Sequence, residues 1–426
     1  MLKRLLIAML FIAGIPALAQ PARQPSAELR GAAERVVALL KGEAQPADIF
    51  AAPFRAQVPD AQVRGVVQQF IAQYGAVQGL GGIEPSSAQA GIIHIRYERA
   101  TVHMQLAVDP APPHLVSGLL LTGADMTGDT MEAVLADLSA LPGQVNFAVA
   151  RLRDGAPVLT SSLDPDRVLA TGSTFKLFIL GELSRQVQAG QRHWGDVVTI
   201  DRSSIGGGTI AGFPRGAPIT LHTLASLMIS ISDNSATDIL LHVLGRENVE
   251  RTMAAMGVRD PARNRPLLST LELGLLKAAP ANALALWQQA DEATRRQLLA
   301  NDYAATDASR INVAIFAGNP LRIDSVEWFA SASDFVRVMD WLRLHADDGA
   351  KAILGISPGL PQQARTALRY AGYKGGSEPG VANLTYLIQT GGGTWYAVSL
   401  GWNDPAAPVD ANRLAGLAAR AIQLLR

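Results

Sequence analysis

The 426-residue chain contains no cysteine. Disulfide bonds, thiolate metal sites and cysteine nucleophiles are therefore excluded. Its seven histidines do not show the spacing that is typical of zinc ligands. We accordingly expect neither a bound metal nor another cofactor.

An excess of charge of one sign is lacking too, because 37 basic residues balance 37 acidic ones. Such a chain has no electrostatic footprint for nucleic acid and no basic tail for an anionic membrane. Charged residues make up 17% of the chain and hydrophobic residues 48%. Together with the length, this composition predicts a globular protein with a sizeable core, divided into two domains or into a large and a small one.

Long apolar runs are absent apart from residues 5–15. Lys3 and Arg4 precede this run, and Pro16 to Ala19 follow it. A charged start, a short apolar segment and small residues predict a secretory signal peptide, residues 1–19, cleaved after Ala19. The run is too short to span a bilayer comfortably, so we expect no membrane anchor after cleavage and an exported, periplasmic protein.

Residues 20–125 are predicted to form a small accessory domain. Helical periodicity covers residues 27–41, 47–54 and 60–74. Strand patterns cover residues 92–97, 100–108 and 114–121. The Gly- and Ser-rich residues 75–90 break the helical pattern, and the three strand patterns follow them. Helices followed by an antiparallel meander predict an α+β layer. It resembles cystatin-like or steroid-isomerase-like domains, and we interpret His94 and His103, which can meet across a hairpin, as sheet-face histidines.

Residues 171–180, T-G-S-T-F-K-L-F-I-L, begin a helix that is apolar on nearly every side. Ser173 is expected at the start of this helix, where its hydroxyl can cap the first turn. Lys176 lies one turn later on the same face, without a neighbouring carboxylate. Burying its ammonium is costly unless it finds partners or loses its proton. Lys176 is therefore a candidate general base for a Ser173 nucleophile.

A second polar cluster, Ser232-Asp233-Asn234, separates the apolar helices predicted at residues 221–231 and 235–244. Such residues cap helices, but three in a row exceed what capping needs. We interpret the Ser232 hydroxyl as a proton donor to a leaving nitrogen and the Asn234 amide as a donor to a substrate carbonyl. Asp233 would brace the turn.

A third cluster, Lys374-Gly-Gly-Ser377, leads into the strands predicted at residues 381–389 and 395–402. Glycines such as Gly376 let a substrate backbone approach a strand closely. The N–H groups of Ser377 and Ser173 are candidates for an oxyanion hole.

These three clusters, in this order, resemble the S-x-x-K, S-D-N and K-[T/S]-G motifs of class A β-lactamases and penicillin-binding proteins. The resemblance covers about residues 127–426, and the two-domain layout is similar to β-lactamase-like proteins of clavulanic-acid gene clusters. It implies an α+β β-lactamase/transpeptidase-like domain at residues 126–426, with helices on both faces of an antiparallel sheet. It also implies a serine hydrolase that opens small-molecule β-lactams through an acyl-enzyme, with a role in β-lactam catabolism and antibiotic resistance.

Two departures from the family pattern bear on the chemistry. Gly375 stands where Thr or Ser is usual, so the hydroxyl that contacts a substrate carboxylate would come from Ser377. The class A segment E-x-x-L-N, which supplies the deacylating glutamate, is absent, and Glu272 is the carboxylate near its place. Because Ser269-Thr-Leu-Glu272 matches a capping box, we favour capping over catalysis for Glu272 and expect Lys176 to activate the deacylating water. Residues 323–329 are expected to form a wall over the site.

Two further functions stay open from the sequence. One is a related esterase or D-alanyl peptide hydrolase that β-lactams merely inhibit. The other is a β-lactam-binding sensor without turnover. The sequence determines neither the preferred substrate nor the oligomeric state.

Overall fold

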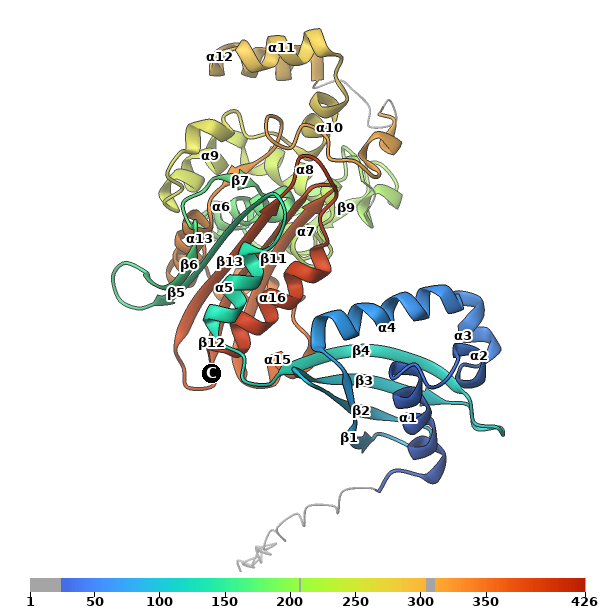
Figure 1. Cartoon of the computed structure of the whole chain (residues 1–426). Coiled ribbons are helices and arrows are strands. Elements are labelled where there is room, and N and C mark those ends of the chain that lie inside the picture. Colours follow the sequence, from blue (N-terminus) through green and yellow to red (C-terminus); the bar gives the residue numbers. More distant parts are fainter. Residues whose placement is uncertain (1–23, 207, 304–310, 426) are drawn as a thin grey trace, which may run out of the picture. The chain divides into compact units, whose positions relative to one another are not determined.

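The computed structural model describes residues 24–206, 208–303 and 311–425 and divides the chain into two compact units, Met1–Thr127 and Gly128–Arg426 (Figure 1). The predicted signal peptide lies outside the described residues. Among the helices that are described, none has both the length and the apolar character needed to cross a membrane.

In its described residues, from 24 on, the first unit combines four helices with a four-stranded antiparallel sheet of order β1-β2-β3-β4. Its elements are α1 (Ala27–Leu40), α2 (Pro46–Ile49), α3 (Ala52–Gln57), α4 (Asp60–Tyr74), β1 (Val77–Pro85), β2 (Ala90–Tyr97), β3 (Ala100–Val108) and β4 (Val116–Met126). The Ser26 hydroxyl caps α1 by accepting a hydrogen bond from the Leu29 N–H at 3.1 Å. The buried stripe of α1 packs on alternate side chains of the sheet, including Ile93 and Val102.

The sequence predicts three strands in this unit, and the structure adds a fourth, because β1 occupies Val77–Pro85 within the glycine-rich range. Glycines at positions 79, 81 and 82 weaken the strand pattern in the sequence. The strand nevertheless forms as an irregular edge, with two register shifts against β2. Pairing with a regular neighbour therefore overrides the local propensity.

The second unit is built on a five-stranded antiparallel sheet of order β11-β12-β13-β5-β6. The strands are β5 (Gln144–Leu152), β6 (Val158–Leu163), β11 (Leu368–Glu378), β12 (Val381–Thr390) and β13 (Trp395–Asn403). Since β13 pairs with β5, segments from the two ends of this unit lie side by side at the centre of the sheet.

Helices cover both faces of this sheet, as the sequence predicted (Figure 1). Alternation along β5 sends Phe147 toward α5 (Met131–Ser139) and α16 (Ala411–Gln423), while Ala148 faces the other helical layer. Arg420 of α16 forms ion pairs with Asp129 at 2.8 Å and Asp137 at 2.6 Å. The predicted α+β fold with helices on both faces is thus confirmed.

The remaining elements lie between β6 and β11. They are β7 (Leu169–Ala170), η1 (Gly172–Phe175), α6 (Lys176–Gln188), β8 (Val197–Thr199), η2 (Ile210–Gly212), β9 (Pro218–Thr220), α7 (Leu221–Ser230), α8 (Asn234–Leu244), α9 (Arg246–Ala255), η3 (Pro261–Asn264), α10 (Thr270–Ala278), α11 (Ala281–Gln289), α12 (Glu292–Leu298), η4 (Leu299–Tyr303), η6 (Val313–Phe316), β10 (Phe329–Ala330), α13 (Ala332–His345), α14 (Asp348–Leu354) and α15 (Gln362–Thr366). The first nine residues of α6 are all buried, so the prediction of a helix enclosed on nearly every side is confirmed.

Replacing Phe178 by Ala should lower the free energy of unfolding of the second unit by about 3–5 kcal/mol, because it empties a core position. Phe178 is 1% exposed, and its ring lies near that of Phe335, with centroids 6.2 Å apart. All six tryptophans belong to this unit, so their fluorescence in urea follows its unfolding. Phe213→Ala, at a side chain 45% exposed, is the control and should change stability by less than about 0.5 kcal/mol. Equal urea midpoints for the two variants would contradict the described core.

Candidate active site

Ser173 lies in the 3-10 turn η1, between β7 and α6. The expectation that its hydroxyl caps the helix is wrong, because α6 begins only after this turn, with Phe175 at the N-cap position and no side-chain cap. A segment distant in the sequence holds the residue before this turn, because the Thr171 N–H donates to the Trp328 carbonyl at 2.9 Å. Within the described part of the chain, the Ser173 hydroxyl makes no hydrogen bond and is thus available to a ligand.

The Lys176 amine is completely buried and points to the second motif. It donates to the Ser232 carbonyl at 2.7 Å, to the Ser232 hydroxyl at 3.0 Å and to Asn234 Oδ1 at 2.7 Å. In the described residues no hydrogen bond joins it to the Ser173 hydroxyl. The amine therefore sits one turn from Ser173 and is anchored by the segment that contains Ser232.

Lys374 brings the third motif to the same hydroxyl. Its amine donates to Ser232 Oγ at 3.1 Å and to the Gly375 carbonyl. Ser232 has a φ of 62°, a left-handed conformation that non-glycine residues rarely adopt. Such strain persists only where the surroundings enforce it. The three sequence motifs thus converge, with the Ser232 hydroxyl between two lysine amines.

Burial changes the charge state of both amines. It lowers the pKa of Lys176 well below its ordinary value, and the nearby Lys374 adds to this effect, while Asp238 and Asp233 oppose it. Burial also lowers the pKa of Lys374 to about 7. The lowered pKa favours the unprotonated form of the Lys176 amine, which is able to accept a proton from a neighbouring hydroxyl.

Strand β11 meets the turn that carries Ser173 through two glycines. A Cβ added at Gly376 would lie 2.2 Å from the Thr171 carbonyl oxygen and 2.4 Å from Ser173 N. A Cβ added at Gly172, whose φ is +49°, would lie 3.1 Å from Ser377 N. The backbone nitrogens of Ser173 and Ser377 thus border the same tight contact, where two N–H groups can serve one oxyanion.

The other two residues of the second motif hold its loop in place. Asp233 caps α8, accepting from the Ala236 N–H at 2.9 Å, and also accepts from the Ile210 N–H at 3.0 Å. The Asn234 amide donates to the Ile205 carbonyl at 2.9 Å while its oxygen accepts from Lys176. The expected bracing role of Asp233 agrees with these contacts, and one of the two Asn234 amide hydrogens is already engaged.

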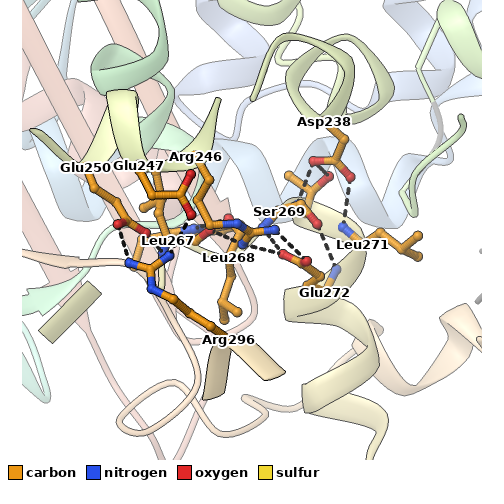
Figure 2. A network of polar contacts seen from close by, with 12 residues as sticks. Asp238, Arg246, Glu247, Glu250, Leu267, Leu268, Ser269, Leu271, Glu272 and Arg296 are labelled. Carbon is orange, nitrogen blue, oxygen red and sulfur yellow. Dashed lines mark hydrogen bonds and ion pairs between the residues drawn. The ribbon is translucent and has the colours of Figure 1, made fainter. Parts of the chain in front are cut away.

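Glu272 belongs to a capping box, as expected (Figure 2). Its side chain accepts from the Ser269 N–H at 2.7 Å, and the Ser269 hydroxyl accepts from the Glu272 N–H at 3.1 Å. Arg246 also holds both carboxylate oxygens, at 2.8 and 2.7 Å. Figure 2 shows this pair within a wider group of ionic contacts that includes Glu250 and Arg296.

Asp238 was not singled out from the sequence. Its carboxylate accepts from the Thr270 N–H and hydroxyl, both at 2.7 Å, and from the Leu271 N–H at 3.0 Å (Figure 2). It thereby ties α8 to the start of α10, and burial raises its pKa. Its spacing of four residues from Asn234, on the same helix face, was the available signal.

The segment expected to wall the site packs against the turn that carries Ser173. The Trp328 ring stacks on Phe175 with centroids 3.7 Å apart, and its indole N–H donates to the Leu268 carbonyl at 2.9 Å. β10, which follows directly, pairs with β7.

In the first unit, His94 and His103 meet across the β2–β3 hairpin, with their Nδ1 atoms 2.6 Å apart. Glu84 lies 3.1 Å from His94 Nε2, and Asp125 lies 3.1 Å from His103 Nε2. Over the described ranges, no cluster of three or more His, Asp or Glu side chains is arranged to hold a metal ion.

Residues 129–331 match the family model described as the beta-lactamase enzyme family. Over these residues the second unit is similar to the β-lactamase enzyme family. No curated protein matches the sequence. Among solved structures, the chain is similar to the β-lactamase from Sphaerobacter thermophilus DSM 20745, with 21% identity, 69% of this chain and 93% of that chain covered, and a TM-score of 0.48.

Two other similar structures are PBP-A and a β-lactamase from Chitinophaga pinensis DSM 2588. PBP-A has 16% identity, covers 69% of this chain and 92% of its own length, and gives a TM-score of 0.45. The Chitinophaga enzyme has 15% identity, and the match covers 69% of this chain and 97% of that enzyme, with a TM-score of 0.47. A point mutant of PBP-A has been solved as an acyl-enzyme complex with penicillin G.

Replacing Gly376 by Ala should reduce acylation of this β-lactamase-like protein at least about tenfold, because the added methyl group displaces the turn that carries Ser173. Gly392→Ala is the matched control, since its added Cβ would meet nothing closer than 3.8 Å. The rate of adduct formation with a penicillin, followed by intact-mass spectrometry, is the measurement. Equal acylation rates in both variants would show that the contact between β11 and the turn does not matter.

The Lys374 amine should titrate near pH 7, as its burial implies. The chain has only six lysines, so ¹³C-labelled lysine side chains can be resolved by NMR. Lys374→Met should remove this titration and Lys41→Met, at an exposed position, should leave it. Because the folded pKa lies below the usual 10.5, the unfolded chain binds more protons between pH 7 and 10.5, and this group makes stability rise with pH there. Lysine signals that all titrate near pH 10 would contradict the described burial.

Proposed function

We propose that this protein is a serine β-lactamase that hydrolyses the β-lactam ring through an acyl-enzyme on Ser173. The convergence of the Lys176 and Lys374 amines on the Ser232 hydroxyl carries this proposal. A buried amine with a lowered pKa beside a free serine hydroxyl supplies the base and nucleophile that acyl transfer needs.

Acylation begins when neutral Lys176 takes the Ser173 proton and Ser173 Oγ attacks the lactam carbonyl. The distance between base and nucleophile shortens in the substrate complex, since catalytic hydrogen bonds often tighten only there. The N–H groups of Ser173 and Ser377 stabilise the oxyanion. The proton then passes from Lys176 to Ser232, along the 3.0 Å hydrogen bond, and from Ser232 to the leaving nitrogen.

Substrate binding falls to the other motif residues. Asn234 retains one amide hydrogen for a substrate carbonyl, and Gly376 lets the substrate lie close to β11. The Ser377 hydroxyl contacts the substrate carboxylate in place of the hydroxyl that Gly375 lacks. Lys374, partly protonated near neutral pH, adds positive charge beside that carboxylate.

Deacylation is the slower step in this proposal. Arg246 and the Ser269 N–H already occupy the Glu272 carboxylate, which supports a structural role for it. Lys176 is therefore the proposed base for the deacylating water, as in acylation. The same observation favours a second candidate, a β-lactam-binding protein or a related esterase or D-alanyl peptide hydrolase in which the lactam adduct turns over poorly.

The two units have separate proposed roles. Residues 126–426 form the catalytic domain and residues 20–125 an accessory domain that holds a ligand or partner. With the proposed signal peptide, the mature protein acts in the periplasm, where hydrolysis of β-lactams would give antibiotic resistance or support β-lactam catabolism.

Replacing Ser173 by Ala should abolish the covalent adduct with penicillin or cephalosporin, because no other hydroxyl takes over the attack in this mechanism. Intact-mass spectrometry detects the adduct directly. Ser162→Ala, at an exposed position on β6, is the control and should acylate normally. An adduct that persists in Ser173→Ala would identify a different nucleophile.

Turnover of a chromogenic cephalosporin, followed from milliseconds to the steady state, separates the candidates. A rapid burst followed by slow steady hydrolysis supports the β-lactamase. A burst without turnover supports the sensor, and faster cleavage of esters or D-alanyl peptides than of lactams supports the related hydrolase. Absence of a burst and of turnover would refute all three.

A further inference from the structure

The second unit contains a pocket of about 110 Å³ that includes no residue of the three motifs. Three stretches of chain line it: residues 263–268, residues of the α11–α12 region, and residues 325–329. Trp328 is shared, because it lines this pocket and also stacks on Phe175 beside Ser173.

Three arginines, Arg263, Arg265 and Arg295, give the pocket its charge. Across the described residues, none of the three forms an ion pair with a carboxylate. Arg295 donates to the carbonyls of Trp287 and Gln288, at 3.0 and 3.2 Å. The Arg265 Nε is buried and lacks a hydrogen-bond partner, which is costly for a charged group.

Among the described residues that line this pocket, Glu327 is the one carboxylate, and it is already paired. Lys277, itself fully buried, donates to it at 2.8 Å, and the Trp328 N–H donates at 3.1 Å. Three arginine charges therefore remain uncompensated. This imbalance favours an anion.

Aromatic rings form the apolar part of the lining. The Arg263 guanidinium lies 4.0 Å from the centre of the Phe329 ring, and Arg295 lies 5.4 Å from the Trp287 ring. Stacking of this kind orients a guanidinium, whose fork binds a carboxylate with two hydrogen bonds. The volume of about 110 Å³ is below that of the cavity of roughly 150 Å³ known to hold benzene, so the pocket takes a short chain or part of a small ring.

We propose that this pocket binds a small organic carboxylate, with the carboxylate on Arg265 and Arg295 and the apolar portion against the aromatic rings. This site is separate from the lactam site and does not depend on the proposed hydrolysis. The arginine charges account for the anionic part, and Trp287, Trp328 and Phe329 account for the organic part.

Benzoate is the probe, titrated into the full chain by calorimetry and by tryptophan fluorescence, since Trp287 and Trp328 line the pocket. We expect saturable binding of one benzoate that weakens as salt increases. Benzamide, of the same shape without the charge, should not bind, and inorganic phosphate should bind at least about tenfold more weakly than benzoate.

Arg265→Gln and Arg295→Gln should each raise the benzoate dissociation constant at least about tenfold. Arg413→Gln, which removes an exposed arginine on α16, is the matched control and should leave it unchanged. Arg265→Lys keeps the charge and should bind benzoate more tightly than Arg265→Gln. If a glutamine variant fails to fold, the salt dependence and the benzamide comparison in the wild-type protein decide whether the pocket binds a carboxylate.

Four results would each overturn the proposal. The first is the lack of saturable benzoate binding up to about 10 mM, a concentration far above the dissociation constants of ordinary specific binding. The second and third are binding of benzamide as tight as that of benzoate, and binding of phosphate tighter than that of benzoate. The fourth is a loss of benzoate binding in Arg413→Gln equal to that in Arg265→Gln and Arg295→Gln.

Discussion

The site depends on the burial of two lysine amines around one serine hydroxyl. Removing two ammonium groups from water is unfavourable, and their mutual repulsion adds to the cost. The protein meets this cost partly with oxygen acceptors, since Lys176 reaches the Ser232 carbonyl and Asn234 Oδ1, and Lys374 reaches the Gly375 carbonyl. The remainder appears as lowered pKa values at both lysines. An arrangement that is poor for stability thereby favours the unprotonated form of the Lys176 amine.

The sheet makes this arrangement possible. β11 is an edge strand of this sheet. In chain order it follows β6 only after all the helices and short strands that lie between them. The same strand presents Lys374 to Ser232 and brings Gly376 against the backbone of Ser173. One rigid element thus sets two relationships, the spacing of the two lysine amines and the place of the turn that carries Ser173. A side chain at position 376 would disturb the second of these, because its Cβ would meet the backbone of Thr171 and Ser173.

The buried carboxylates around the site act mainly as supports. Glu272 closes a capping box with Ser269 and is clamped by Arg246, while Asp238 ties α8 to α10. Both oxygens of the Glu272 carboxylate already accept hydrogen bonds from Arg246, so a water molecule would have to compete with these contacts to reach it. The fold of the second unit therefore does not by itself determine whether a carboxylate is available to activate water.

Local patterns in the sequence determined much of this protein. The motifs around Ser173, Ser232 and Lys374, the helix over residues 60–74, the strand over residues 100–108 and the Glu272 capping box were all readable, because periodicity and capping involve residues close together along the chain. Only the tertiary structure decided that Ser173 lies within a 3-10 turn and leaves the helix uncapped, that the glycine-rich residues 77–85 pair as an edge strand, and that Arg265 and Arg295 face one pocket. These outcomes depend on packing between distant segments, whose free energy no local window of sequence contains.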